Sequence, residues 1–370
     1  MTEQSFIFHL PRPRQLIQSM SARVRSPDIE LDTARMVLDH YAERLNQTPR
    51  NLPLGQRSRN VVLNTSTGKK VLKRYRKEWE LPAIEFGHSL LIHLAEIGFP
   101  APRLMTTTGG HTFVTQEGHH YALFDFIEGN NYSSKFVSRA NWLKLVYLAG
   151  QNLARYHQQI TGFSPKGSHH LGFKSYEEDR IRNLAWYVTH ITDLRQKSLD
   201  LNPEDDQIIV RWLIEKSGLM IEELHRLDEE LNAASLPRLV IHGDYGIQNL
   251  LFKKDGTVIP LDFELARIEW RLSDLVTSLA RFQSRNGRFD FEAMGTFVSA
   301  YLVENPWSED EWQYLPQVWK FRRIQRAVLL WKSYFESERS RFRLILAREM
   351  LDQADWVMEH REKLLALNPV

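Results

Sequence analysis

The sequence predicts an α+β fold in which a small, strand-rich N-terminal part precedes a larger, mostly helical C-terminal part. Residues 52–74 and 111–127 alternate apolar and polar side chains around short turns, as β-hairpins do. Residues 141–157 instead repeat apolar side chains at intervals of three and four, which is typical of a buried helix. The change of period places the boundary between the two parts near residue 125.

Three segments follow from this pattern. Residues 1–30 contain several prolines and arginines without clear periodicity, so we expect an N-terminal arm. Residues 31–125 are expected to form an N-lobe with an amphipathic first helix, the two hairpins and one helix near residues 80–97. Residues 126–370 are expected to form a helical C-lobe, in which residues 205–232 make one long helix.

Composition limits the classes of function. The formal net charge is +2, so no strong field favours nucleic acid or an anionic membrane as a partner. No run approaches 18 uninterrupted apolar residues, and the N-terminus lacks the pattern of a secretory signal. The chain has no cysteine, which excludes disulfides and fits the cytoplasm. We expect a cytoplasmic protein without nucleic-acid or membrane partners; the sequence gives no indication of an oligomeric state.

The most informative segment contains His242-Gly243-Asp244, then Asn249, then Asp262. A kinase needs a carboxylate to accept a proton from the attacking hydroxyl, and oxygen-bearing side chains to hold magnesium on the nucleotide phosphates. Asp244, Asn249 and Asp262 are the residue types for these roles. The alternative, that these polar residues only occupy turns, is disfavoured by the apolar strands on both sides.

The spacing predicts a hairpin that brings two of these residues together. Residues 249–253 and 258–262 read as short strands, and pairing 253 with 258 puts Asn249 opposite Asp262. Directly paired side chains on neighbouring strands are about 5 Å apart, within reach of one cation. Amide and carboxylate oxygens suit Mg²⁺, which takes further ligands from water and phosphates.

At these residues the chain resembles the aminoglycoside phosphotransferase, choline kinase and type II homoserine kinase group, which has a two-lobed protein-kinase-like fold. The resemblance implies ATP and Mg²⁺ as cofactors and Asp244 as the catalytic base. It makes Asn249 and Asp262 the magnesium ligands, with Glu264 assisting at the metal. Asn249 is thereby also expected at the nucleotide. It also implies that Asp274 braces the catalytic loop from inside the protein.

The same resemblance assigns residues of the N-lobe to the nucleotide. Lys73 takes the place of the lysine that grips the α and β phosphates, and Gly55 lies in the loop over them. In the resembled enzymes this lysine pairs with a glutamate on the next helix, but the corresponding residue here is Gly87. The sequence leaves open whether another carboxylate, such as Glu80 or Glu85, replaces it.

Residues 125–127 are implied to be the interlobe hinge whose backbone reads adenine, so Asp125 and Ile127 are expected at the cofactor. The C-terminal region corresponds to the acceptor pocket. Its basic residues suggest either a solvated face or a site for an anionic acceptor or partner, and they argue against a polycationic antibiotic. These residues are Arg322, Arg323, Arg326, Lys332, Arg339, Arg341 and Arg343.

The leading hypothesis is therefore an ATP-dependent phosphotransferase that acts on a hydroxyl of a small metabolite. Homoserine-like amino alcohols come first among acceptors, followed by choline-like alcohols, sugars and aminoglycoside-like compounds. Two alternatives remain open. One is a serine/threonine protein kinase, although His-Gly-Asp lacks the arginine that would receive an activation-loop phosphate. The other is a catalytically weak nucleotide-binding scaffold, which Gly87 favours.

Overall fold

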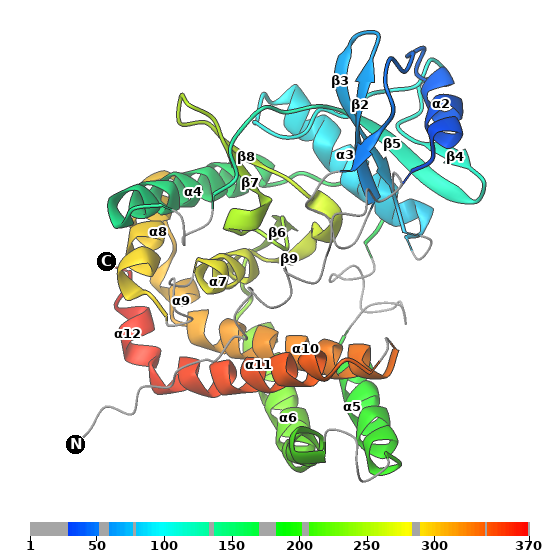
Figure 1. The fold of residues 1–370 in the computed structure, drawn as a ribbon. Coiled ribbons are helices and arrows are strands. Elements are labelled where there is room, and N and C mark those ends of the chain that lie inside the picture. Colours follow the sequence, from blue (N-terminus) through cyan, green and yellow to red (C-terminus); the bar gives the residue numbers. More distant parts are fainter. Residues whose placement is uncertain are drawn as a thin grey trace.

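A computed structural model describes most of the chain in two parts, a strand-rich upper part and a helical lower part (Figure 1). The described residues are 29–51, 59–76, 79–132, 137–169, 183–201, 207–282, 289–336 and 339–368. The expected arm, up to residue 28, lies outside them. Within these ranges, no helix is both long and apolar enough to cross a lipid bilayer.

The upper part is a five-stranded antiparallel sheet in the order β1-β2-β3-β5-β4. Its strands are β1 (Arg50–Asn51), β2 (Arg59–Thr65), β3 (Gly68–Arg74), β4 (Val114–Gln116) and β5 (His119–Asp125). Both hairpins that the alternating patterns predicted are present, as β2–β3 and β4–β5. Leucine and valine side chains of the central strands pack against helix α2 (Leu31–Asp39). Helix α3 (Leu81–Glu96) belongs to the larger core cluster.

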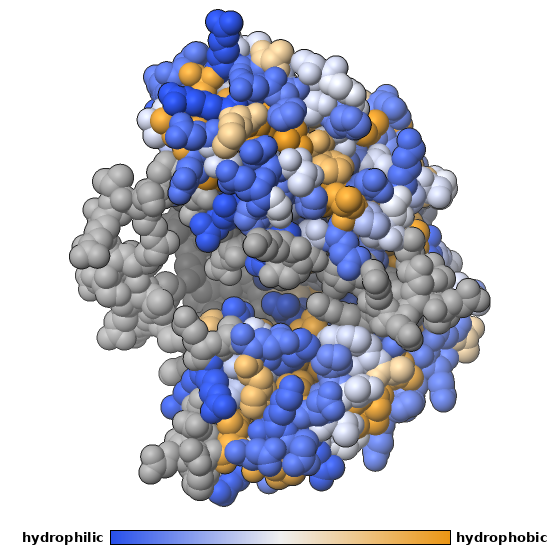
Figure 2. Space-filling view, turned by 90° about the vertical axis from the view of Figure 1, so that its right-hand side faces the viewer, coloured by the Kyte–Doolittle hydropathy of each residue, from blue (hydrophilic) through white to orange (hydrophobic). Residues whose placement is uncertain are grey.

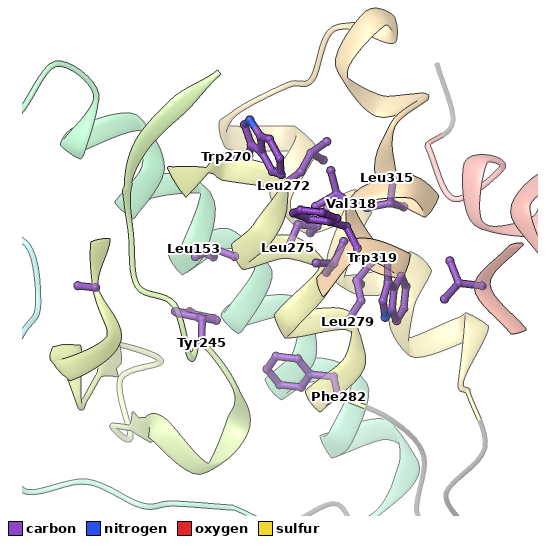
Figure 3. Packing of buried hydrophobic residues seen from close by; sticks show 14 of the residues in the cluster. Leu153, Tyr245, Trp270, Leu272, Leu275, Leu279, Phe282, Leu315, Val318 and Trp319 are labelled. Atoms are coloured by element: carbon purple, nitrogen blue, oxygen red, sulfur yellow. The ribbon is translucent and has the colours of Figure 1, made fainter. Parts of the chain in front are cut away.

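The lower part is built from helices around one large core. Its helices are α4 (Arg139–Ile160), α5 (Leu184–Leu199), α6 (Gln207–Ala233), α7 (Arg271–Arg281), α8 (Phe291–Glu304), α9 (Glu309–Trp312), α10 (Leu315–Glu336), α11 (Arg341–Glu359) and α12 (Arg361–Leu365). One face of α7 meets the start of α10 through buried apolar side chains (Figure 3). These are Leu272, Leu275 and Leu279 on α7, with Leu315, Val318 and Trp319 on α10.

Two short antiparallel ribbons lie between α6 and α7 in the sequence. β6 (Arg238–Ile241) pairs with β9 (Arg267–Trp270), and β7 (Leu250–Phe252) pairs with β8 (Val258–Pro260). Single turns of 3₁₀ helix, η1 (Ile247–Asn249) and η2 (Phe263–Leu265), flank the second ribbon. These turns and the residues directly before them carry Asp244, Asn249, Asp262 and Glu264 of the predicted site.

The predicted register of the β7–β8 hairpin is wrong by one residue. Leu250 lies opposite Pro260, and the N–H of Leu261 donates to the carbonyl of Asn249, so Asn249 faces Leu261 rather than Asp262. The cause is the turn: Lys253 pairs with Thr257, and Gly256 takes a left-handed conformation with φ of +90°. A tight turn closed by a left-handed glycine replaces the longer turn assumed from the sequence.

Candidate active site

Asp244 lies on the loop between β6 and η1, and a glycine determines how that loop passes its neighbours. Gly243 has φ of +79°, which other residues rarely adopt. A Cβ atom there would lie 2.2 Å from the carbonyl oxygen of Leu265 and 2.5 Å from Nη1 of Arg267. Only glycine fits both constraints, which explains the middle residue of His-Gly-Asp.

Asp274 holds this loop from the core. Its carboxylate accepts the N–H of His242 at 2.6 Å, the N–H of Gly243 at 2.7 Å and Nε2 of His157 at 3.1 Å. Burial alone would raise the pKa of Asp274, but the hydrogen bond to His157 and the electrostatic interactions with His157 and His242 lower it below the usual value. The bracing role implied by the resemblance is confirmed by these contacts. His157 is fully buried and therefore structural.

Asn249 is fixed against Asp244. Its Nδ2 donates to the backbone carbonyl of Asp244 at 2.9 Å and to Oδ2 of the same residue at 3.1 Å. Both partners are acceptors, so the amide nitrogen must face them and Oδ1 must point the other way. The structure therefore brings Asp244 and Asn249 into direct contact and presents an amide oxygen beside them.

Asp262 has a strained backbone at the end of the β7–β8 ribbon. Its φ of 62° and ψ of 64° are left-handed, which costs a non-glycine residue roughly 1–3 kcal/mol and is common at functional sites. The side chain is 44% exposed, and its Oδ1 lies 3.6 Å from Nζ of Lys73. The carboxylate is thus accessible to a ligand next to the N-lobe lysine.

Lys73 pairs with Glu264, which answers the question left by Gly87. Nζ of Lys73 lies 2.6 Å from Oε1 of Glu264, and their side chains are only 13% and 4% exposed. Burial would lower the pKa of Lys73, but the charges of Glu264 and Asp262 outweigh it and raise the pKa above the ordinary value. The lysine therefore stays charged and is held over the loop that carries Asp262.

Helix α3 is joined to the strand of Lys73 by a buried polar chain. Tyr75 lies next to Lys73, whose Nζ is 5.4 Å from its ring centre. The Tyr75 hydroxyl is bonded to Nε2 of His88 at 2.8 Å, and Nδ1 of His88 is bonded to Thr112 at 2.8 Å. Burial and the charge of Lys73 lower the pKa of His88 to about 3, so this ring is neutral. Sequence reasoning missed this connection.

Of the predicted hinge residues, Asp125 ends β5 and Ile127 lies two residues beyond it. The carboxylate of Asp125 pairs with Nζ of Lys70 at 2.7 Å, and its N–H donates to the carbonyl of Arg103. Ile127 is partly buried just beyond. Gly55, the predicted loop residue over the phosphates, lies outside the described residues. Figure 2 shows a hollow between the upper and lower halves of the face that it displays.

Sequence reasoning also missed Arg281 at the end of α7. Its Nη2 lies 2.9 Å from Oδ1 of Asp244, across 37 positions in the chain. A Cβ on Gly246 would lie 2.9 Å from Cβ and Cγ of Arg281, so the stem of the arginine rests on the loop that carries Asp244. The glycine two residues after Asp244 was the available signal, but a glycine alone does not identify its neighbour.

The donor set fits a hard cation and a phosphorylated ligand. Asn249 offers an amide oxygen and Asp262 an accessible carboxylate, which together suit Mg²⁺ when phosphates and water complete its shell. Lys73 adds a fixed positive charge beside Asp262. Within the described ranges no three His, Asp or Glu side chains form a metal cluster of their own. This arrangement can position a metal-bound polyphosphate next to the Asp244 carboxylate.

Known proteins resemble the chain over most of its length. Residues 48–314 match the model of the phosphotransferase enzyme family. A homoserine kinase of Phenylobacterium zucineum is 26% identical over 263 residues, covering 71% of this chain and 72% of that enzyme. A homoserine kinase of Caulobacter vibrioides is 23% identical over 264 residues, covering 71% and 74%.

Solved kinases have the same fold. A microcompartment-associated aminopropanol kinase superposes with a TM-score of 0.64 at 18% identity, covering 92% of this chain and 100% of that one. An amicoumacin kinase, solved in complex with AMP-PNP, Ca²⁺ and Ami, gives a TM-score of 0.60 at 14% identity, covering 92% of this chain and 96% of that one. These likenesses confirm the predicted two-lobed, protein-kinase-like fold.

Proposed function

Since the chain belongs to the phosphotransferase enzyme family, we propose that it transfers the γ-phosphoryl group of ATP to a hydroxyl of a small metabolite. The observation that carries the assignment of roles is two sets of side-chain contacts, on segments that the backbone bond from the N–H of Leu261 to the carbonyl of Asn249 holds together. Asp244 and Asn249 touch each other, and Asp262 and Glu264 both lie at Lys73. Each role that phosphoryl transfer requires has a residue of the right chemistry.

The nucleotide is proposed to lie between an N-lobe of residues 31–125 and a C-lobe of residues 126–370. Lys73 would bind its α and β phosphates, with Gly55 in the loop above them and the backbone of Asp125 and Ile127 beside adenine. Asn249 and Asp262 would hold Mg²⁺, with Glu264 next to them. When bound, the cation neutralises charge on the transferred group.

Asp244 is proposed as the base. A hydrogen bond from Asn249 to Oδ2 and an ion pair between Arg281 and Oδ1 engage both of its carboxylate oxygens. Asp274 anchors the backbone on its N-terminal side, so the carboxylate cannot drift from the acceptor hydroxyl. Holding reacting groups in place is the main contribution that a protein makes to phosphoryl transfer, because it supplies little covalent chemistry itself.

An inactive scaffold is not favoured by the structure. The scaffold hypothesis was favoured by Gly87, which stands where the resembled enzymes have a glutamate partner for the lysine. In this protein Lys73 instead has a buried partner in Glu264. Among acceptors, homoserine-like amino alcohols remain first, since the curated relatives named above are homoserine kinases.

Release of ADP tests the proposal. The protein would be mixed with ATP and Mg²⁺ and screened in a coupled assay against amino alcohols, sugars, nucleosides and aminoglycosides. We expect acceptor-dependent ADP release with at least one hydroxyl compound, and mass spectrometry should find that compound heavier by one phosphoryl group. Nucleotide binding without turnover on the whole panel would contradict the proposed activity.

A further inference from the structure

The segment that follows α4 is fastened to helix α3. A Cβ on Gly167, whose φ is +74°, would lie 2.3 Å from the carbonyl oxygen of Pro82 and 3.0 Å from the backbone nitrogen of Phe86. The N–H of Ser168 donates to the same carbonyl of Pro82 at 2.8 Å. The two backbones therefore touch at the start of α3, and glycine is required at position 167.

The contact continues along α3. The backbone N–H of Lys166 donates to Oγ of Ser89 at 2.9 Å. Nearer the end of the helix, the rings of His93 and Phe163 stack with their centres 4.2 Å apart. Contacts at the start, middle and end of α3 therefore hold this helix against residues 163–168.

His169 joins this segment to the turn beside Lys73. It is 3% exposed, and the centre of its ring lies 5.0 Å from that of Trp79 and 6.1 Å from that of Phe86. Nε2 of the ring lies 3.0 Å from the carbonyl oxygen of Glu264. Because a carbonyl oxygen only accepts hydrogen bonds, Nε2 carries the proton of this bond.

The carbonyl that accepts this bond belongs to η2, a turn on which two groups of the proposed site depend. The side chain of Glu264 holds Nζ of Lys73 at 2.6 Å, and Asp262 directly precedes the turn. A single turn of 3₁₀ helix holds itself weakly, since its hydrogen-bond geometry is poorer than that of an α-helix. A buried bond from outside the turn therefore helps to fix its backbone.

We propose that His169 is a positioning residue for the nucleotide phosphates, on which it acts through η2 without touching them. This inference rests on the proposed function and deepens it. By holding the backbone of η2 next to α3, His169 keeps Lys73 and the Asp262 carboxylate in place for the phosphates and the cation. Its effect falls on these groups of the ligand and not on adenosine.

Three variants separate the hydrogen bond from the packing of the ring. His169→Phe keeps an aromatic ring in the same surroundings but cannot donate to the carbonyl of Glu264. His169→Gln loses the ring but carries an amide N–H at a similar distance along the side chain, so it should restore part of the bond. The matched control is His93→Phe, which keeps the ring stack on Phe163. Each variant is first compared with wild type for folding.

Calorimetry with two ligands measures the effect without turnover. ADP with Mg²⁺ engages the phosphate and cation sites, whereas adenosine has no phosphate. We expect His169→Phe to bind ADP with Mg²⁺ about tenfold more weakly than wild type, as for the loss of one buried hydrogen bond, and to bind adenosine as wild type does. His169→Gln should bind ADP more tightly than His169→Phe does, and His93→Phe should match wild type.

Amide hydrogen exchange gives a second readout that needs no ligand. The N–H of Ala266 closes η2 by donating to the carbonyl of Phe263. It should exchange about tenfold faster in His169→Phe than in wild type, and at the wild-type rate in His93→Phe.

The outcomes separate the inference from the proposed function. Unchanged affinity for ADP in His169→Phe would overturn the inference, and so would equal losses for ADP and adenosine, which indicate a general structural role. A loss of ADP affinity without faster exchange at Ala266 would overturn the route through η2. Failure of the proposed function would appear differently, because wild type would then neither bind ADP nor release it from ATP, while exchange at Ala266 would still respond to His169→Phe.

Discussion

Oε1 of Glu264 lies 2.6 Å from Nζ of Lys73, so the lysine of the N-lobe sheet is tied to the loop that carries Asp262. The Glu264 side chain comes from the C-lobe, two residues after the predicted metal ligand. One short segment therefore positions both Lys73 and the Asp262 carboxylate, which we propose bind the phosphates and the cation. In the resembled enzymes the partner of this lysine is expected on the following helix, where this chain has Gly87.

Breaking that ion pair should destabilise the protein. Glu264→Gln removes one buried charge and leaves Lys73 without its main partner, so we expect the free energy of unfolding to fall by about 3 kcal/mol in urea titrations. In the Lys73→Met background, Glu264→Gln should lower the free energy of unfolding far less, because the positive charge that pairs with Glu264 is absent. If the effects of the two substitutions on the free energy of unfolding were additive, the interaction between Lys73 and Glu264 would not stabilise the protein.

Asp244→Asn should abolish transfer while preserving the fold. The amide cannot accept the hydroxyl proton, and loss of a general base typically lowers kcat by about 10²–10⁴-fold. Binding of an ATP analogue with Mg²⁺, measured by calorimetry, should stay near the wild-type value. Asp255→Asn, in the exposed turn of the β7–β8 hairpin, is the matched control and should keep full activity. Retained turnover in Asp244→Asn would exclude Asp244 as the base.

Gly87→Ala should stabilise the protein slightly. Gly87 lies inside α3, and a Cβ there would meet no atom within 4 Å. Replacing an unstrained glycine in a helix interior by alanine contributes about 0.5–1 kcal/mol, so the melting temperature should rise. Activity should not change, since Lys73 is held by Glu264. A fall in stability would mean that the backbone at this position needs glycine for a reason absent from the structure.

His88 should make stability depend on pH. Its folded pKa is about 3, against an ordinary value of 6.5, so between these values the unfolded chain binds the extra proton. Stability is therefore lost as pH falls below about 6.5, at about 1.4 kcal/mol per pH unit from this group. His88→Gln should lose less stability than wild type between pH 6 and pH 5 in urea titrations. The exposed His111→Gln serves as control, and parallel curves for wild type and His88→Gln would contradict the assignment.

The order of strands and helices could be predicted because apolar residues recur with clearly different periods in the two. The register of the β7–β8 hairpin could not. One residue of error moved Asn249 from Asp262 to Leu261. The spacing of polar residues is the same for either turn, and only the conformation of Gly256 selects between them.

Long-range partners were harder to predict than motifs. Asp244, Asn249 and Asp262 lie within one short segment, so their residue types and spacing pointed to a shared site. Glu264 and Lys73 come from different lobes, and no periodicity links them. Arg281 is likewise remote from Asp244 in sequence, and its contact depends on how α7 packs against the core.

The most direct measurement is a crystal structure with a non-hydrolysable ATP analogue and Mg²⁺. We predict one cation at about 2.0–2.1 Å from oxygens of Asn249 and Asp262, with Lys73 on the phosphates and the Asp244 carboxylate facing the γ-phosphate. A nucleotide bound away from Lys73, or a cation that contacts neither Asn249 nor Asp262, would contradict the proposed site.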